Sequence, residues 1–158
     1  MFILVRALTY ATLFIGLVLI FLPRGILSST GITQPSVTGT WQIAGMFLGM
    51  TGAILALSCI FTFVFVGKGT PAPFDPPRRL VMQGPYSLAR NPMYIGAGLA
   101  LAGAALFYQS VALLAYAGLF LLIMQLFVVT YEEPTLRRTF GDEYKAYCDR
   151  VGRWGPRW

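Results

Sequence analysis

Four long apolar stretches limit what this chain can fold into. They cover residues 2–22, 41–66, 92–107 and 111–131, which is more than half of the 158 residues. A helix of about 20 apolar residues crosses a lipid bilayer. Only 11% of the residues are charged and the mean hydropathy is +0.67, so a soluble domain of this size could not bury so much apolar surface. The sequence therefore predicts an all-α integral membrane bundle of four transmembrane helices.

The first stretch can also be read as a cleaved signal peptide. Such a peptide has an apolar core of about 7 to 15 residues followed by a small-x-small cleavage site. The stretch from Phe2 to Leu22 is longer than this core and is followed by Pro23-Arg24-Gly25, with no such site close by. We therefore interpret it as a retained helix that ends at Pro23.

Basic residues are distributed unevenly around the four stretches. Of the twelve Lys and Arg residues, only Arg24 falls on one side of the expected membrane, and the other eleven fall on the opposite side. Basic residues are retained on the cytoplasmic side. We therefore expect both termini, the loop 67–91 and the tail 132–158 to be cytoplasmic, in the inner membrane of a prokaryote. Because the basic residues flank apolar spans and form no single face, the net charge of +6 does not indicate a nucleic-acid partner.

The loop before the third stretch has the residues of a structured turn. Gly84-Pro85 predicts a turn, and the four prolines at 71, 73, 76 and 77 favour extended polyproline geometry. Asn91 is suited to cap a helix that begins at Pro92. The free amides of such a helix N-terminus suit a carboxylate or another polar ligand atom. The three residues Tyr108-Gln109-Ser110 then predict a tight antiparallel pair of helices.

The acidic pair Glu132-Glu133 is the feature that we would least expect if this chain were only a membrane scaffold. Acidic side chains at a helix C-terminus oppose the helix dipole, and Pro134 is expected to turn Glu133 out of helical geometry. The pair is either a solvated helix end or a carboxylate that holds a cationic or hydroxyl-bearing ligand near the third helix. Along straight helices Gly96 lies about 20 Å and Glu132 about 34 Å from the Gln109 turn, so a contact needs the fourth helix to tilt or an extended ligand between them.

Other candidate residues have both a structural and a functional interpretation. Gly96 belongs to a row of small residues typical of helix packing in membranes, and Tyr86 and Tyr94 fit an interfacial aromatic belt or a site for a sulfonium or ammonium ion. The chain has no histidine, and Cys59 and Cys148 occupy different environments, so we expect neither a metal site nor a disulfide.

The tail has the pattern of an amphipathic helix. Phe140, Tyr144, Tyr147 and Val151 recur at helical spacing. We expect this helix to lie on the membrane interface, anchored by the two tryptophans at 154 and 158, where it could cover a cavity.

These motifs together resemble one family of membrane enzymes. The chain reads Gly-Pro-Tyr-x3-Arg-Asn-Pro-x-Tyr-x-Gly from Gly84, Glu-Glu-Pro-x-Leu from Glu132, and Phe-Gly-Asp-Glu-Tyr-x3-Cys-x-Arg-Val from Phe140. In order and spacing this is similar to the isoprenylcysteine carboxyl methyltransferase and phospholipid methyltransferase superfamily, over residues 80–154. The resemblance implies an S-adenosyl-L-methionine site on the cytoplasmic side. The cofactor-binding residues that it implies are Leu80, Val81, Tyr86, Asn91, Pro92, Met93, Tyr94, Gly96, Gly98, Glu132 and Glu133; no catalytic residue is assigned.

Three departures from the superfamily pattern bear on the substrate. Asn91 stands where the isoprenylcysteine branch has histidine, and residues 127–129 lack the arginine that would hold a substrate carboxylate, which argues against a prenylcysteine. Gly152 stands where relatives often have proline, and we expect it to loosen the tail.

The expected organisation is two N-terminal transmembrane helices in residues 1–66 and a methyltransferase module in residues 67–158. The expected function is methyl transfer from S-adenosyl-L-methionine to a lipophilic or small hydrophobic acceptor, with a membrane lipid as partner. A carboxylate, an amine and a thiol are all compatible acceptors, and the sequence does not define the oligomeric state. A non-catalytic membrane scaffold or lipid-binding subunit is the alternative, and a membrane reductase is a weaker one because no phosphate-binding glycine loop is present.

Overall fold

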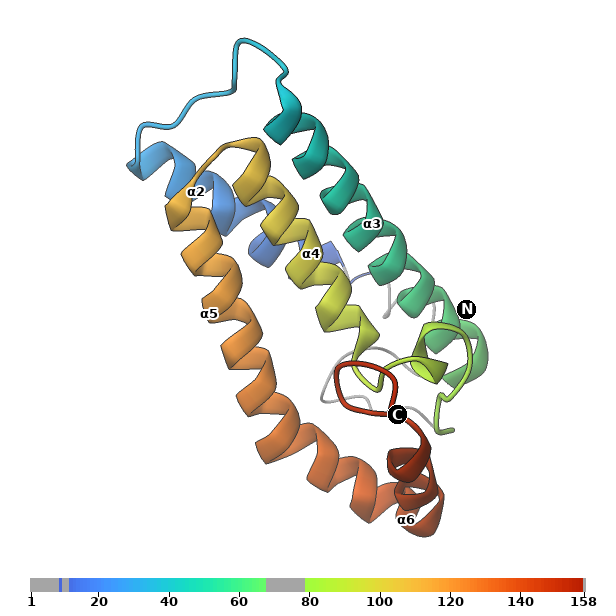
Figure 1. Ribbon diagram of the computed structural model, residues 1–158. Helices are drawn as coiled ribbons and strands as arrows, with labels where there is room; N and C mark the ends of the chain where they lie inside the picture. Colours follow the sequence, from blue (N-terminus) through green and yellow to red (C-terminus); the bar gives the residue numbers. More distant parts are fainter. Residues whose placement is uncertain (1–8, 10–11, 68–78, 158) are drawn as a thin grey trace.

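The structure is a computed structural model that describes residues 9, 12–67 and 79–157. Within these residues the chain is almost entirely helical, with a single isolated β-bridge between Val151 and Pro156 (Figure 1). The elements are η1 (Ile15–Phe21), α2 (Leu22–Ser29), α3 (Thr40–Thr62), η2 (Phe63–Gly67), η3 (Gly84–Ser87), α4 (Pro92–Phe107), α5 (Val111–Phe127), η4 (Val128–Glu132) and α6 (Glu133–Arg150). The all-α prediction is confirmed.

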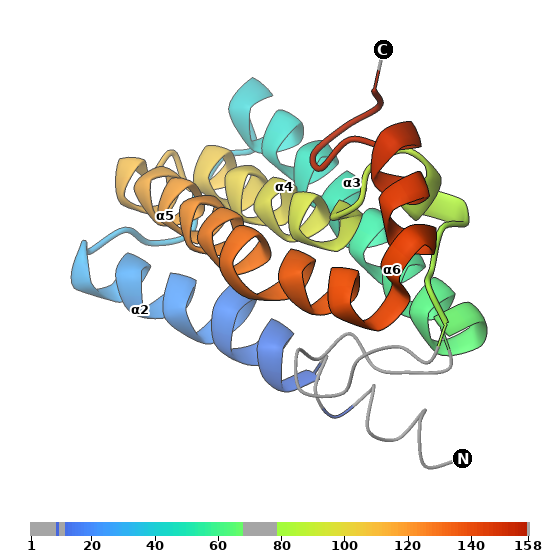
Figure 2. The same ribbon diagram turned by 90° about the horizontal axis from the view of Figure 1, so that it is seen from below.

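Three continuous helical segments are long and apolar enough to cross a membrane. They are Thr12–Ser29, Thr40–Gly67 and the apolar part of Val111–Arg150, and α4 is a shorter apolar helix between them. Figure 2 shows α4 between α3 and α5, with α2 against α5. The expected stretches 41–66, 92–107 and 111–131 therefore coincide with helices, and the protein is an integral membrane protein.

Helices α3 and α4 pack through glycines, as the small-residue row predicts. A Cβ atom added to Gly52 would lie 2.5 Å from the backbone oxygen of Gly96, and one added to Gly96 would lie 2.8 Å from the backbone nitrogen of Ala56. Gly45 and Gly103 meet in the same way about two turns further along. Because lipid gives helices no hydrophobic reason to associate, close backbone packing of this kind holds them together.

The turn between α4 and α5 forms as expected. Gln109 adopts a left-handed conformation with φ of 49°, and the Ser110 hydroxyl accepts a 3.2 Å hydrogen bond from the amide of Leu113. This cap satisfies one of the free amides at the start of α5. The helices therefore run antiparallel, which returns the chain to the end of the bundle where α4 began.

Two expectations about prolines are wrong. The first helix does not end at Pro23 but continues to Ser29, and Glu133 is helical, with φ of −61° and ψ of −45°, although Pro134 follows it. In both places a π-helical turn, η1 or η4, comes directly before the proline-containing helix. The wider turn shifts the hydrogen-bond pattern, so the missing proline N–H is accommodated without breaking the helix.

The tail differs from a helix lying on lipid. Gly141, with φ of 51° and ψ of −120°, kinks α6, and the part that follows is the predicted amphipathic helix. Its residues Tyr144 and Tyr147 are buried and pack with Val151 against Leu80 and Met82 of the loop. The apolar face therefore faces protein. The four loop prolines, Trp158 and most of the residues before Thr12 lie outside the described residues.

Candidate active site

Four segments distant in sequence meet at one end of the bundle. They are the loop 79–91 with η3, the first turn of α4, the junction of η4 with α6, and the tail 151–157 (Figures 1 and 2). The chain bends from α5 through η4, so that α6 comes beneath the start of α4 (Figure 1). This bend supplies the tilt that a contact between the two predicted regions needs.

Tyr94 and Glu132 are in direct contact. The Tyr94 hydroxyl donates a 3.1 Å hydrogen bond to Oε2 of Glu132. Tyr94 is buried, with 9% of its surface exposed, and Glu132 is half-buried. The aromatic and the carboxylate that the sequence indicated as ligand-binding groups therefore lie side by side at the first turn of α4.

Glu133 has different partners from its neighbour. Arg153 donates from Nε to Oε1 at 2.7 Å and from Nη2 to Oε2 at 3.0 Å, and Nη1 of Arg90 lies 3.1 Å from Oε1. The hydrogen bonds from Arg153 raise the pKa of its guanidinium further. Glu133 is 7% exposed, and its two oxygens are taken up by two cations. The acidic pair therefore splits into a saturated carboxylate and one with a single described partner.

Arg90 lies at the centre of this network. Its Nη1 also donates to the Tyr144 hydroxyl at 3.1 Å and to the Cys148 sulfur at 2.8 Å. Its Nε is buried and has no hydrogen-bond partner among the described residues. An unpaired buried donor is uncommon in proteins, and it leaves Arg90 with one hydrogen bond that a ligand or a water can accept.

The expectation that Asn91 caps α4 with its side chain is wrong. Its Nδ2 donates instead to the carbonyl oxygen of Arg153 at 3.2 Å, which also accepts the Asn91 backbone amide. The amide of Arg90 donates to the carbonyl of Gly152 at 2.9 Å. Asn91 therefore binds the tail instead of the first turn of α4, because the tail carbonyls pair with the backbone of residues 90 and 91. Because no side chain caps α4, the amides of Met93 and Tyr94 keep the free donors of a helix N-terminus.

Gly152 tightens the tail where we expected it to loosen it. A Cβ atom at this position would collide with the carbonyl oxygen of Gly155. The absence of a side chain lets the chain turn back at once, so that Val151 and Pro156 pair. Trp154 then reaches α5, where its Nε1 donates to the side-chain oxygen of Gln125 at 2.6 Å.

Several predicted site residues lie within the protein interior. Val81 and Tyr86 pack with Cys59 of α3, and Met93 lies against the same cluster. The carbonyl of Tyr86 accepts a 2.6 Å hydrogen bond from the Tyr147 hydroxyl, and burial raises the pKa of Tyr86 well above its usual value. Tyr86 therefore stays neutral and fixes the loop against α3.

The two glycines of the predicted cofactor motif face neighbouring helices. Gly96 faces the backbone of α3, as described above, and a Cβ atom on Gly98 would lie 2.7 Å from the side chain of Leu121 in α5. Pro92 is buried as the first residue of α4, and Leu80 packs on the tail. The structure thus brings Tyr94, Glu132, Glu133 and Asn91 together, while Gly96 and Gly98 set the distance between helices.

Arg153 is the residue that sequence reasoning missed. In the sequence it is one of the basic residues of the tail, whereas in the structure it binds Glu133 and its carbonyl accepts a hydrogen bond from Asn91. The only signal in the sequence is its position in Arg-Val-Gly-Arg-Trp, directly after the glycine that departs from the superfamily pattern.

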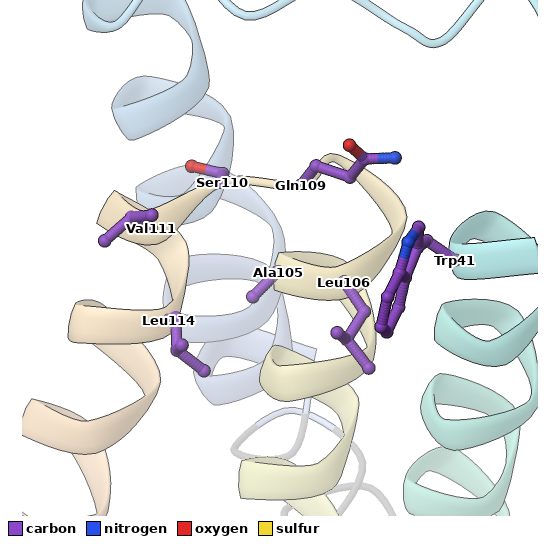
Figure 3. Close-up of a pocket in the computed structure, with 7 residues that line it drawn as sticks. All are labelled: Trp41, Ala105, Leu106, Gln109, Ser110, Val111 and Leu114. Carbon is purple, nitrogen blue, oxygen red and sulfur yellow. The ribbon is translucent and has the colours of Figure 1, made fainter.

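Two pockets lined by described residues lie at the other end of the bundle. One has a volume of about 220 Å³ and lies at the α4–α5 turn, where Trp41 faces Leu106 (Figure 3). The other, of about 530 Å³, lies between α2 and the same turn. Neither contains a residue of the predicted site.

The helices and the polar cluster define an integral membrane protein with a group of charged and polar residues at one end of an apolar bundle. The model of the phospholipid methyltransferase family matches residues 35–143, about two thirds of the chain. The chain belongs to this family, and it is therefore an S-adenosyl-L-methionine-dependent membrane methyltransferase of lipid-type acceptors. No curated protein and no solved structure matches it.

The residues at the start of α4 are chemically suited to S-adenosyl-L-methionine. The cofactor carries a carboxylate, ribose hydroxyls and a sulfonium. Free helix amides and the unpaired Nε of Arg90 can donate to an anion, and Glu132 can accept from hydroxyl groups or face a cation.

Proposed function

We propose that this protein transfers a methyl group at the cytoplasmic membrane surface, in a site between the first turn of α4 and Glu132. The observation that carries the proposal is the hydrogen bond between Tyr94 and Glu132, which joins the two motifs across the helical hairpin. The excess of basic residues at this end supports the cytoplasmic assignment of the site and of both termini, in the inner membrane of a prokaryote.

Glu132 is the glutamate that we assign to cofactor binding. Its carboxylate has one described hydrogen bond, from Tyr94, and so retains acceptor capacity for a ligand. Glu133 is engaged by Arg90 and Arg153, and a ligand would have to displace one of them. We assign to Glu133 the role of holding the loop, α6 and the tail in place.

The other predicted residues divide into two groups in this proposal. Asn91 and Pro92 set the start of α4, and Met93 and Tyr94 in its first turn offer their free backbone amides to the cofactor. The remaining residues support the site without contacting the cofactor, because they pack the loop or set the spacing of the helices. They are Leu80, Val81, Tyr86, Gly96 and Gly98.

The absence of histidine does not prevent this chemistry. Bound S-adenosyl-L-methionine supplies an electrophilic methyl group on its sulfonium. The protein must hold the acceptor in line with that group, and such positioning supplies up to about 7 to 11 kcal/mol in favourable cases. For an amine acceptor, Glu132 or a water takes up the proton that the amine must lose before it attacks.

The acceptor is a lipophilic molecule that reaches the site from the bilayer. An amine, a carboxylate and a thiol all fit the residues present. For an anionic nucleophile, the exclusion of water from the site lowers the reaction barrier most. The absence of an arginine in residues 127–129 disfavours a carboxylate held by charge. Incubation of membranes with radiolabelled methyl donor, followed by identification of the labelled lipid, establishes the acceptor.

The decisive test of the site compares Glu132→Gln with Glu133→Gln in detergent-purified protein. We expect Glu132→Gln to weaken binding of S-adenosyl-L-methionine and S-adenosylhomocysteine by at least 10-fold in calorimetry, because a charged hydrogen bond is worth about 1.5 to 3 kcal/mol. Its thermal unfolding without ligand should remain close to that of the wild type. Glu143→Gln on the exposed surface of α6 is the matched control. Unchanged affinity in Glu132→Gln would remove Glu132 from the site.

A further inference from the structure

A groove at the end of the bundle opposite the candidate active site has the features of a lipid-binding site. It has a volume of about 530 Å³ and lies between α2, the loop that follows α2, and the α4–α5 turn. Leu19, Ile20 and Leu27 form its wall on the first helical segment, and Leu113 forms the wall on α5. These parts of the wall are apolar, whereas Arg24, Ser28, Gln34 and Tyr108 give the groove its polar lining.

Arg24 lines this groove and gives it a charge. It is the only Lys or Arg between positions 7 and 67, and the first acidic residue in the chain is Asp75. Arg24 is exposed, and it forms no ion pair with any residue that the structure describes. All the carboxylates that the structure does describe belong to η4 and α6, at the other end of the molecule. Among the described residues, therefore, no carboxylate is placed to pair with Arg24.

We propose that this groove binds an anionic phospholipid, with the phosphate on Arg24 and one acyl chain along the apolar wall. Arginine binds phosphate through paired, charge-assisted hydrogen bonds. Ser28 and Tyr108, which also line the groove, add hydroxyl groups for the glycerol and phosphate oxygens. The polar and the apolar parts of the groove thus correspond to the two parts of one lipid molecule.

The neighbouring pocket shows why the charge identifies the occupant. Trp41, Leu106 and Leu114 line it together with Gln109, and no charged residue takes part (Figure 3). Such a pocket fits any lipid chain and selects no headgroup. Arg24 distinguishes the larger groove from it.

This lipid is distinct from the methyl acceptor. The groove includes Ala104 and Tyr108 at the end of α4, whereas Tyr94 lies in its first turn. The 16 residues of α4 span roughly 24 Å at 1.5 Å per residue. A headgroup on Arg24 is therefore at the opposite membrane face from the site of methyl transfer, and the inference does not depend on where the cofactor binds.

Native mass spectrometry of the full-length protein in detergent tests the proposal with phosphatidylglycerol as the probe. We expect Arg24→Gln to reduce the bound fraction of phosphatidylglycerol at least 5-fold, while Arg138→Gln, an exposed charge on α6, leaves it unchanged. Wild-type protein should retain phosphatidylglycerol over phosphatidylcholine of the same chains. Equal retention of the two lipids, or undiminished binding by Arg24→Gln, would overturn the proposal.

A second pair of variants tests the acyl-chain part of the groove. Ile20→Trp adds bulk where the chain would lie, and Leu119→Trp adds the same bulk on the exposed side of α5, outside the groove. We expect only Ile20→Trp to lower lipid binding, with thermal unfolding as the check on folding. Equal binding by both tryptophan variants would show that the lipid touches Arg24 alone and would overturn the groove assignment. Should Arg24→Gln fail to fold, the comparison of the two lipids on wild-type protein decides the role of charge.

Discussion

Arg153 holds the carboxylate of Glu133 through two hydrogen bonds of 2.7 and 3.0 Å, across 20 residues of chain. The carbonyl oxygen of the same arginine accepts a hydrogen bond from Asn91, so one tail residue connects the start of α6 to the start of α4. The tail is therefore part of the candidate active site.

Removal of Glu133 should destabilise the protein strongly. Glu133→Ala leaves Arg90, whose side chain is 11% exposed, as a buried cation without its carboxylate. Breaking a buried ion pair from one side costs about 3 to 5 kcal/mol. We expect a loss of unfolding free energy of about 3 kcal/mol, measured by denaturant titration in detergent, and faster proteolysis of the tail. Glu143→Ala, on the exposed face of α6, should change it by less than about 0.5 kcal/mol. A Glu133→Ala protein as stable as this control would contradict the structural role.

The Tyr94 hydroxyl should matter for cofactor binding more than for stability. Tyr94→Phe removes the hydrogen bond that orients Glu132 and leaves the ring in place. We expect the loss of this hydrogen bond to reduce the binding free energy of S-adenosylhomocysteine by about 1 kcal/mol. This corresponds to roughly 5-fold weaker binding in calorimetry. Tyr116→Phe removes a comparable hydrogen bond to the carbonyl of Val18, far from the site, and should leave affinity unchanged. Equal affinity in the two variants would separate Tyr94 from the cofactor.

A methyl group at Gly52 should disrupt the packing of α3 on α4. The added Cβ of Gly52→Ala would lie 2.5 Å from the backbone of Gly96, and backbone cannot move aside as a side chain can. We expect a loss of about 2 kcal/mol or more in unfolding free energy. Gly118→Ala on α5 has nothing within 4 Å and should be neutral or slightly stabilising, because alanine favours the helix. If both variants unfold alike, close α3–α4 contact does not hold the bundle together.

Tyr147→Phe should loosen the loop before α4. The Tyr147 hydroxyl bonds the carbonyl of Tyr86 at 2.6 Å, and both residues are buried. Without the hydroxyl this buried carbonyl loses its partner, which costs about 1 to 3 kcal/mol. Hydrogen exchange should show faster opening of residues 84–91, with α3 unchanged. Protection of this segment at the wild-type level would mean that another group replaces the hydroxyl.

The helices could be predicted because their signals are local. The apolar stretch ending at Phe107, the three-residue turn at Gln109 and the proline at position 92 each act on their own neighbourhood. The two helix ends that were predicted wrongly, at Pro23 and at Glu133, lie beside π-helical turns. A single wide turn has no distinct residue pattern, so sequence reasoning placed a break where the helix continues.

The candidate site could be predicted only as a set of regions. The distribution of basic residues and the motif spacing indicated that the start of the third helix and the acidic pair belong together, since both face the same side of the membrane. Nothing local distinguishes Glu132 from Glu133, which are adjacent and identical in type. Their partners, Tyr94 and Arg153, lie 38 and 20 residues away.

The sequence by itself determined that this is a membrane-spanning helical protein, which end of it carries the charges, and which motifs mark its family. Those properties follow from the length and polarity of continuous segments, because a bilayer acts on each segment separately. Only the tertiary structure decided that Glu133 binds two arginines while Glu132 has a single described partner, that Asn91 binds the tail and leaves its helix uncapped, and that Gly96 faces α3. These outcomes depend on which distant groups compete for the same hydrogen bond or the same space, and only the folded chain brings those groups together.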